Sequence, residues 1–228
     1  MTGFSTEDTK DIPTLVKDPE LVEKRRAQIV GAAVRLFSEK GFHETTTREI
    51  GRATGFSIGT LYEYIQSKED VLYLVCDAIH REMEESLRAA IQVGVNGRET
   101  LEQAIAAYIE VCDKMQDSIL LVYRETSSLK NDSMGYVLRN EERVTSLFED
   151  ILRTGVKDKS LSVADPKAIE LMSHNIAVIG HTWALRRWAL RKRYRLSEYI
   201  ALQTSLILRE LSAETPISRG KSNTRTRR

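Results

Sequence analysis

The most informative stretch of the chain is residues 45–65, TTTREIGRATGFSIGTLYEYI. It predicts two short helices with a tight turn between them. Thr46 or Thr47 can cap the first helix, and Glu49 lies three residues after Thr46, as in a capping box. Gly55 can adopt the left-handed backbone conformation that ends this helix and makes the turn. The pattern is typical of a helix-turn-helix.

The second short helix is predicted over about residues 58–65. In a helix-turn-helix the two helices cross closely, which requires particular residue types where they meet. Ile50 and Leu61 can supply the apolar contact, and Gly51 leaves room for it. Phe56 can fill the gap against the long helix that precedes the pair. All of these requirements are met together, which makes the prediction fairly specific.

An ordinary helical hairpin inside an all-α core is the alternative interpretation, and the outward face of the second helix argues against it. Leu61 and Ile65 are expected to face inward. Five residues would face outward with hydroxyl groups or small surfaces: Ser57, Gly59, Thr60, Tyr62 and Tyr64. Hydroxyl groups and a bare glycine backbone suit close contact with phosphates and base edges. This face therefore favours DNA binding.

The rest of the chain predicts helices throughout, so the expected fold class is all-α. Apolar residues recur at helical spacing, and no long alternation of Val, Ile or Thr with polar residues predicts a sheet. Four parts follow: residues 1–17 as a flexible arm, 18–66 as a three-helix DNA-binding domain with the helix-turn-helix, 67–214 as a helical ligand-binding and dimerisation domain, and 215–228 as a basic disordered tail. Beyond residue 67, helices are expected over about 68–91, 99–114, 118–129, 134–156, 166–188 and 197–211.

Composition fits a folded protein of the cytoplasm. Hydrophobic residues make up 41% and charged residues 29%, and the net charge of +1 neither supports nor excludes DNA binding. Cys76 and Cys112 have no close partner and no metal-type spacing, so a reducing compartment is the simpler interpretation. We expect no signal peptide and no membrane span, because no stretch is long and apolar enough. No cofactor and no metal are expected.

In these motifs the sequence resembles the TetR family of bacterial transcriptional regulators. The residues that carry the resemblance are Ile29 to Phe37 with Gly41-Phe42, Thr45 to Ile50, Gly55 to Ile65 and Ser67-Lys68-Glu69. The later helices match the family in architecture. Trp183 to Trp188, followed by Tyr199-Ile200, also looks like the end of such a regulator.

The resemblance implies roles in DNA binding for particular residues. Thr47 and Arg48 would reach the DNA, and Lys68 would bind a phosphate, since a lysine and free N–H groups at a helix start favour an anion. Bases and backbone in the major groove would be contacted by Ser57, Gly59, Thr60, Tyr62 and Tyr64. Tyr64 could equally be a packing residue. Gly59 departs from the bulkier residue that some relatives have there, which puts a base contact at that position in doubt.

A homodimer that reads a palindromic operator is the expected assembly, because a single helix-turn-helix gives weak specificity. The resemblance implies a four-helix bundle built by the last two helices of each protomer. Apolar faces fit this role, with core packing as the alternative for part of them. These faces are Leu196, Tyr199, Ile200, Leu202, Leu206, Ile207 and Leu211 on the final helix, and Ile176, Val178, Ile179, Trp183 and Leu185 on the one before.

The middle helices are expected to enclose an effector site. The candidate ligand-binding residues are Tyr108, Cys112, Tyr123, Arg124, Asn175, His181 and Trp183. Arg124 follows four apolar or aromatic residues and needs a partner, which could be Glu125, Glu141 or an anionic ligand. His174 and His181 share a helix face, but two histidines without a third ligand are weak evidence for a metal site.

The expected function is a ligand-responsive transcriptional regulator, a repressor by the family's usual behaviour. A small apolar or amphipathic effector would release the operator through linkage, and an acyl-CoA is one option. A DNA-binding protein without effector control is the first alternative, and a small-molecule-binding enzyme is the second. No glycine-rich phosphate loop, nucleophile elbow or metal-ligand motif in the sequence supports an enzyme.

Overall fold

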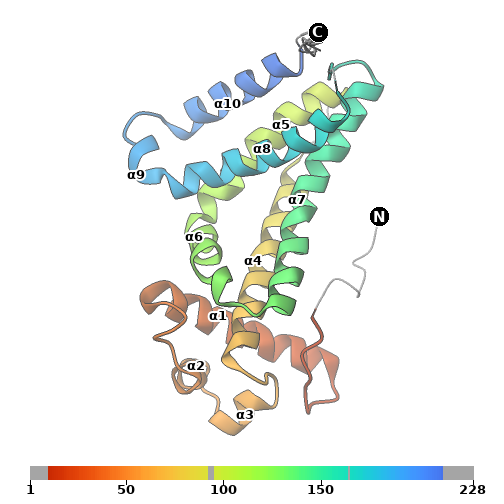
Figure 1. Cartoon of the computed structure of the whole chain (residues 1–228). Helices are drawn as coiled ribbons and strands as arrows, with labels where there is room; N and C mark the ends of the chain where they lie inside the picture. The colour runs from red at the N-terminus through yellow and green to blue at the C-terminus, as the bar shows by residue number, and fades with distance from the viewer. Residues whose placement is uncertain (1–9, 92–94, 164, 213–228) are drawn as a thin grey trace, which may run out of the picture.

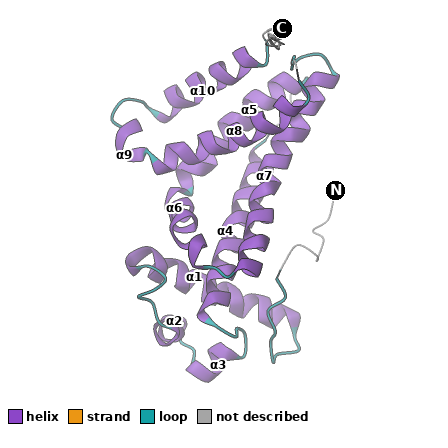
Figure 2. Cartoon of the chain, viewed as in Figure 1, coloured by secondary structure: helices purple, strands orange, loops and turns teal. Residues whose placement is uncertain are grey.

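The computed structural model describes residues 10–91, 95–163 and 165–212. Within these ranges every regular element is a helix and none is a strand (Figure 2). The elements are α1 (Pro19–Lys40), α2 (Thr47–Thr54), α3 (Ile58–Tyr62), α4 (Lys68–Ala90), α5 (Gly97–Lys114), α6 (Gln116–Glu125), the 3-10 helix η2 (Thr126–Ser128), α7 (Asn131–Lys157), α8 (Lys167–Leu185), α9 (Arg187–Leu190) and α10 (Leu196–Glu210). The all-α prediction is confirmed.

The helices form two groups, with α4 as the connection between them (Figure 1). α1, α2 and α3 lie together at one end of the molecule. α4 leaves this end beside α7, and α5, α8 and α10 cross over the far end of that pair. The described residues contain no helix that is long and apolar enough to cross a membrane.

Local sequence accounts for the main helix boundaries. The Thr46 side chain accepts from the Glu49 N–H and the Glu49 side chain accepts from the Thr46 N–H, which is the predicted capping box. Ser57 and Ser67 cap α3 and α4 in the simpler way. Gly55 has φ of 76°, so the left-handed turn after α2 occurs where a residue without Cβ avoids its steric cost.

Three predicted helix spans differ from the structure. The helix expected over residues 58–65 ends at Tyr62, and the span 118–129 divides into α6 and η2. The span 166–188 breaks at Arg186 between α8 and α9. Each break falls in a run without glycine or proline, because tertiary packing rather than a local breaker residue turns the chain there.

The predicted flexible arm is wrong for residues 10–17, which are packed against α1 and the start of α4. Ile12 is 3% exposed, and its carbonyl oxygen accepts from Arg26 Nη2 at 2.6 Å. Lys10 Nζ lies 2.6 Å from a carboxylate oxygen of Asp70 on α4. A buried isoleucine and two charge-assisted hydrogen bonds hold this segment in place. The remaining part of the arm, residues 1–9, and the predicted tail, residues 215–228, lie outside the described residues.

Candidate functional site

α2 and α3 pack as a helix-turn-helix requires. Ile50 and Leu61 are both fully buried at the crossing, and Gly51 is buried beside them. A Cβ on Gly51 would lie 3.1 Å from the Phe56 carbonyl oxygen, which is tighter than most real contacts. Phe56 packs against the core, and the Arg25 guanidinium of α1 lies 5.2 Å from its ring. The predicted role of each residue in this crossing is confirmed.

The outward surface of this pair is rich in hydroxyl groups. Ser57 and Gly59 are exposed, and Thr60 is half-buried. Tyr62 is 42% exposed, and its hydroxyl lies 3.4 Å from the Thr47 hydroxyl, so α2 and α3 present these groups side by side. Arg48 is exposed on α2.

Ile58 was missed by the sequence reasoning. It is 43% exposed at the start of α3, four residues before Tyr62 and therefore on the same face. An exposed apolar side chain beside hydroxyl groups can contact the methyl group of thymine in the major groove. Its position directly after the Ser57 cap was the available signal.

Of the two interpretations of Tyr64, the packing role is the one that the structure supports, and the outward placement is wrong. It is 4% exposed, and its ring centroid lies 6.4 Å from that of Phe56. Its carbonyl oxygen accepts from Arg26 Nε at 3.1 Å. The physical reason is that α3 ends at Tyr62, so residue 64 no longer continues the outward helical face.

Lys68 makes contacts within the protein that the sequence did not predict. Its ammonium donates to three backbone carbonyl oxygens, of Phe42, His43 and Thr45, at 2.9, 3.1 and 2.8 Å. An ammonium has three N–H bonds, and all three are used here. Lys68 therefore holds the loop between α1 and α2 against the start of α4. It could still attract a phosphate through its positive charge, without a direct hydrogen bond.

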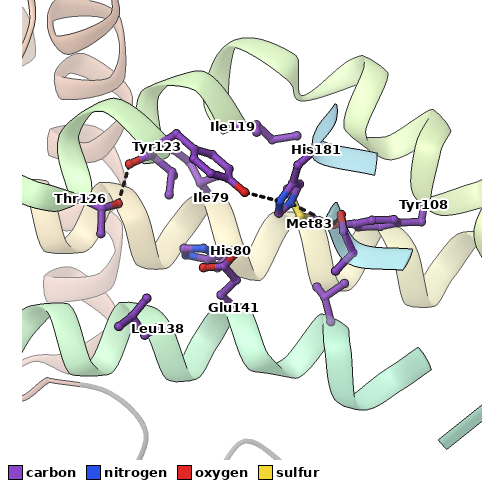
Figure 3. Close-up of a pocket in the computed structure, with 13 residues that line it drawn as sticks. Ile79, His80, Met83, Tyr108, Ile119, Tyr123, Thr126, Leu138, Glu141 and His181 are labelled. Carbon is purple, nitrogen blue, oxygen red and sulfur yellow. Dashed lines mark hydrogen bonds between the residues drawn. The ribbon is translucent and has the colours of Figure 1, made fainter. Parts of the chain in front are cut away.

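A cavity of about 210 Å³ lies between α4, α5, α6, α7 and α8 (Figure 3). Most of its wall is apolar, and each of the helices α4 to α8 contributes one polar group to it, a tyrosine, histidine or glutamate side chain. The lining residues are Ile79, His80 and Met83 from α4, Tyr108 from α5, Ile119, Val122 and Tyr123 from α6, Thr126 from η2, Leu138, Glu141 and Val144 from α7, and Ala177 and His181 from α8.

His181 is held by two tyrosines. Its Nε2 lies 2.9 Å from the Tyr108 hydroxyl and its Nδ1 lies 2.9 Å from the Tyr123 hydroxyl. Gly180 makes this possible, because a Cβ there would lie 2.4 Å from the Tyr108 ring. Burial lowers the pKa of His181 to about 4, with a smaller contribution from the nearby His80, so the ring is neutral near pH 7.

Of the seven predicted ligand residues, Tyr108, Tyr123 and His181 line this cavity, and four do not. Asn175 is exposed on the outer face of α8. Trp183 is 2% exposed, and its Nε1–H donates to Asp113 at 2.7 Å. Cys112 is buried behind Tyr108, and burial raises its pKa to about 12.

Arg124 lies at the junction between the two groups of helices instead of in the cavity. Its Nε donates to Glu125 at 2.6 Å, and Nη2 donates to the Phe37 carbonyl oxygen near the end of α1. Glu125, one of the two partners anticipated from the sequence, is 4% exposed. The other, Glu141, lines the cavity.

Sequence reasoning missed His80, Met83 and Glu141 as cavity residues. Their only signal was their position on the inward stripes of α4 and α7, which they share with ordinary core residues. His174 and His181 do not form a site together, since His174 is exposed and His181 is buried. No group of three potential metal ligands occurs among the residues that the structure describes.

Both groups of helices match families of known proteins. Residues 29–73 match the family described as bacterial regulatory proteins, tetR family. Residues 94–184 match the tetracyclin repressor-like C-terminal domain. The chain is 33% identical over 191 residues to the HTH-type transcriptional regulator HbdR of Aromatoleum sp. (strain CIB), which covers 84% of this chain and 82% of that protein.

The chain belongs to the TetR family. A second relative, the HTH-type transcriptional repressor KstR2 of Rhodococcus jostii (strain RHA1), is 28% identical over 137 residues, 60% of this chain and 67% of that protein. The fold also matches the crystal structure of AibR in complex with isovaleryl coenzyme A and operator DNA. That match has a TM-score of 0.65 and 17% identity, and covers 81% of this chain and 98% of AibR.

Membership of the TetR family decides between the classes considered from the sequence. The family and these relatives are DNA-binding transcription regulators, so the protein is a regulator and not an enzyme. The helix-turn-helix of α2 and α3 is the DNA-binding element of this TetR-type chain.

Acid is expected to destabilise this TetR-type fold through His181. The pKa of His181 falls from 6.5 to about 4 on folding, so the unfolded chain binds the proton first as the pH drops. The effect of His181 on the free energy of unfolding is zero well above pH 6.5. Near pH 4 it amounts to a loss of about 3 kcal/mol of stability. Urea unfolding of the wild type and of His181→Phe at pH 7.5 and pH 5 measures it: the variant should lose less stability between the two pH values. An identical loss in both proteins would contradict the assignment, and His174→Phe is the exposed control.

Proposed function

We propose that this TetR-type protein is a ligand-responsive repressor that binds a palindromic operator as a homodimer. A small apolar or amphipathic effector would enter the cavity and release the DNA. The observation that carries the proposal is the combination, in one chain, of a hydroxyl-rich outer face on α2 and α3 with a mixed polar and apolar cavity between α4 and α8. The cytoplasm is the compartment in which such a protein would meet its DNA, and no cofactor is needed.

DNA binding would involve the exposed part of the helix-turn-helix. Thr47, Arg48, Ser57, Gly59, Thr60 and Tyr62 are the residues proposed to contact it, with Ile58 added as an apolar contact. The short α3 would lie in the major groove, where hydroxyl groups reach base edges and phosphates. We propose residues 18–66 as the DNA-binding domain and residues 67–214 as the sensing and dimerisation domain.

The homodimer would use the outer faces of α8 and α10. Parts of the predicted apolar faces belong to the protomer's own core, since Tyr199, Ile207 and Leu211 are buried. Four large apolar side chains point outward instead: Leu171 and Val178 on α8, exposed by 63% and 56%, and Leu202 and Leu206 on α10, exposed by 53% and 59%. Exposed apolar side chains on two helices that the Tyr199–Ile179 hydrogen bond joins support an interface between protomers.

The cavity supports effector control over the alternative of a regulator without a ligand. It is mostly apolar, as binding sites for small molecules are. AibR, which shares the fold, was solved with an acyl coenzyme A and operator DNA. An acyl-CoA, with its acyl group in the cavity, is therefore our candidate for the effector of this protein.

α4 would couple the cavity to the DNA. Ile79, His80 and Met83 of α4 line the cavity, while Lys68 at its start holds the loop that precedes α2. A ligand that fits one position of α4 better than the other shifts the spacing of the two DNA-binding domains by its differential affinity. Arg124 gives a second link, from α6 to the end of α1.

Removing the outward groups of α3 is expected to weaken operator binding without loss of fold. Thr60→Ala and Tyr62→Ala should each reduce affinity about 5- to 100-fold, the range for loss of one good DNA contact. Fluorescence anisotropy with a duplex selected by the wild type measures affinity, and circular dichroism with sedimentation measures fold and assembly. Gln103→Ala, at an exposed position of α5, is the control. Loss of helicity in both α3 variants would overturn the assigned role.

A further inference from the structure

The hydrogens of the Tyr108, Tyr123 and His181 side chains are all used inside the protein. The Tyr108 hydroxyl lies 3.2 Å from the Ala177 carbonyl oxygen, which can only accept, so this hydroxyl donates there. His181 Nε2, 2.9 Å from the same hydroxyl, must then carry the ring proton and donate. Nδ1 is left as the acceptor for the Tyr123 hydroxyl at 2.9 Å. Three hydrogens thus fill three hydrogen bonds.

His80 and Thr126 have no spare hydrogen either. His80 Nδ1 lies 2.8 Å from the Cys76 carbonyl oxygen and therefore carries the ring proton. The Thr126 hydroxyl donates to the Val122 carbonyl oxygen at 2.5 Å (Figure 3). His80 is 8% exposed, and burial lowers its pKa, so its ring is neutral. Its Nε2, on the side of the ring away from its own helix, is then a bare lone pair at the cavity wall.

Glu141 adds a second acceptor beside this lone pair. Its carboxylate comes from α7 and lies next to His80 in the cavity wall (Figure 3). No lysine or arginine occurs among the described residues that line the cavity. A carboxylate or phosphate on the enclosed part of a ligand would meet this negative charge without a balancing cation.

The cavity wall therefore has unpaired hydrogen-bond acceptors, and a ligand needs a hydrogen-bond donor to pair with them. A buried acceptor that a ligand leaves unpaired costs binding free energy, and a hydroxyl or amino group removes that cost. The volume sets the size of the group that carries it. A cavity of about 150 Å³ is known to hold benzene, so the 210 Å³ available here accommodates one ring with a small substituent.

We propose that the part of the effector enclosed by this cavity is a single ring, or a branched chain of that size, bearing a hydroxyl group that donates to the Glu141 carboxylate or an amino group that donates to both Glu141 and His80 Nε2. The inference rests on the proposed function, in which this cavity is the effector site. The rest of an amphipathic effector would extend from the cavity to solvent between Tyr123 and Leu138. Both residues line the cavity, and they are 48% and 47% exposed.

Matched para-substituted toluenes test the donor directly by isothermal titration calorimetry with the full chain. p-Cresol and p-xylene have nearly the same shape but differ by a hydroxyl donor. We expect p-cresol to bind at least about tenfold more tightly than p-xylene. 4-Methylbenzoate should bind more weakly than p-xylene because of its charge. 4-Methylaniline, compared with p-cresol, tells an amino donor from a hydroxyl donor.

Variants of the protein show which residue is responsible for the preference for p-cresol over p-xylene. Glu141→Leu should reduce the ratio of p-cresol affinity to p-xylene affinity by at least about threefold, because the charged acceptor is lost and only the neutral His80 Nε2 remains. Glu142→Leu, at the exposed neighbouring position of α7 outside the cavity wall, should keep the wild-type ratio. The ratio within one variant is independent of a general loss of stability, and p-xylene binding shows that the cavity is still formed.

The outcomes separate the two proposals. Equal binding of p-cresol and p-xylene to the wild type overturns the donor requirement and leaves the cavity as an effector site. An unchanged ratio in Glu141→Leu overturns the part assigned to Glu141. Failure of every probe to bind, while selected DNA still binds, overturns both the donor requirement and the effector role of this cavity.

Discussion

Replacing Leu202 and Leu206 together by glutamate is expected to give a monomer that has lost about a thousandfold in operator affinity. The two side chains are 53% and 59% exposed on α10 and would be buried in the proposed interface. Burying a leucine contributes about 1.5–3 kcal/mol, and a twofold axis counts each substitution twice. Four buried glutamates add electrostatic repulsion and desolvation. Operator affinity falls because a single helix-turn-helix reads only half of the site.

Sedimentation and anisotropy check this prediction on the same samples. Val95→Glu is the matched control, since Val95 is 92% exposed, lies before α5 and belongs to neither α8 nor α10. The control should remain dimeric and bind DNA like the wild type. A double variant that still sediments as a dimer would rule out this face as the interface. The dimer would then have to form through another surface.

Leu61→Ala is expected to destabilise the DNA-binding domain by about 2–5 kcal/mol, the cost of a large-to-small substitution in a packed core. Leu61 is fully buried where α2 and α3 cross, beside the equally buried Ile50. α3 has five residues and too few hydrogen bonds to persist alone, so its position depends on this contact. Thermal and urea unfolding measure the loss.

The neighbouring residue Ile58 provides the control for Leu61. Ile58→Ala, at a position that is 43% exposed, should cost less than about 1 kcal/mol of stability. The two variants also separate stability from recognition, because Ile58→Ala is expected to affect DNA more than folding. Unchanged unfolding of Leu61→Ala would contradict the inward placement on which the helix-turn-helix assignment depends.

The helix-turn-helix was predictable because its requirements are local. The capping box of Thr46 and Glu49, the turn at Gly55 and the contact between Ile50 and Leu61 all lie within sixteen residues, as the sequence shows. The end of α3 was not predictable, because no breaker residue follows Tyr62 and packing against residues 10–17 and α1 decides the path. Tyr64 was placed on the wrong face for this reason.

The cavity was predictable only in part. Tyr108, Tyr123 and His181 stood out as polar or aromatic groups in apolar helices, and they do meet. Trp183 and Arg124 stood out in the same way but lie outside the cavity. Trp183 donates a hydrogen bond to Asp113. Arg124 donates to Glu125 and to the Phe37 carbonyl oxygen. Five α-helices and η2 enclose the cavity, and the relative rotation of the α-helices decides which stripe of each one faces it. That rotation depends on contacts far apart in the sequence, such as Gly180 against Tyr108.

Selection of binding sites from random duplex DNA with the purified protein, at two salt concentrations, tests the central claim most directly. We predict a palindromic motif with two half-sites, recovered at both concentrations, because two copies of α3 would read the DNA about a twofold axis. Binding that yields no motif and falls steeply as salt rises would indicate phosphate contacts alone and contradict the claim of a sequence-specific dimeric regulator.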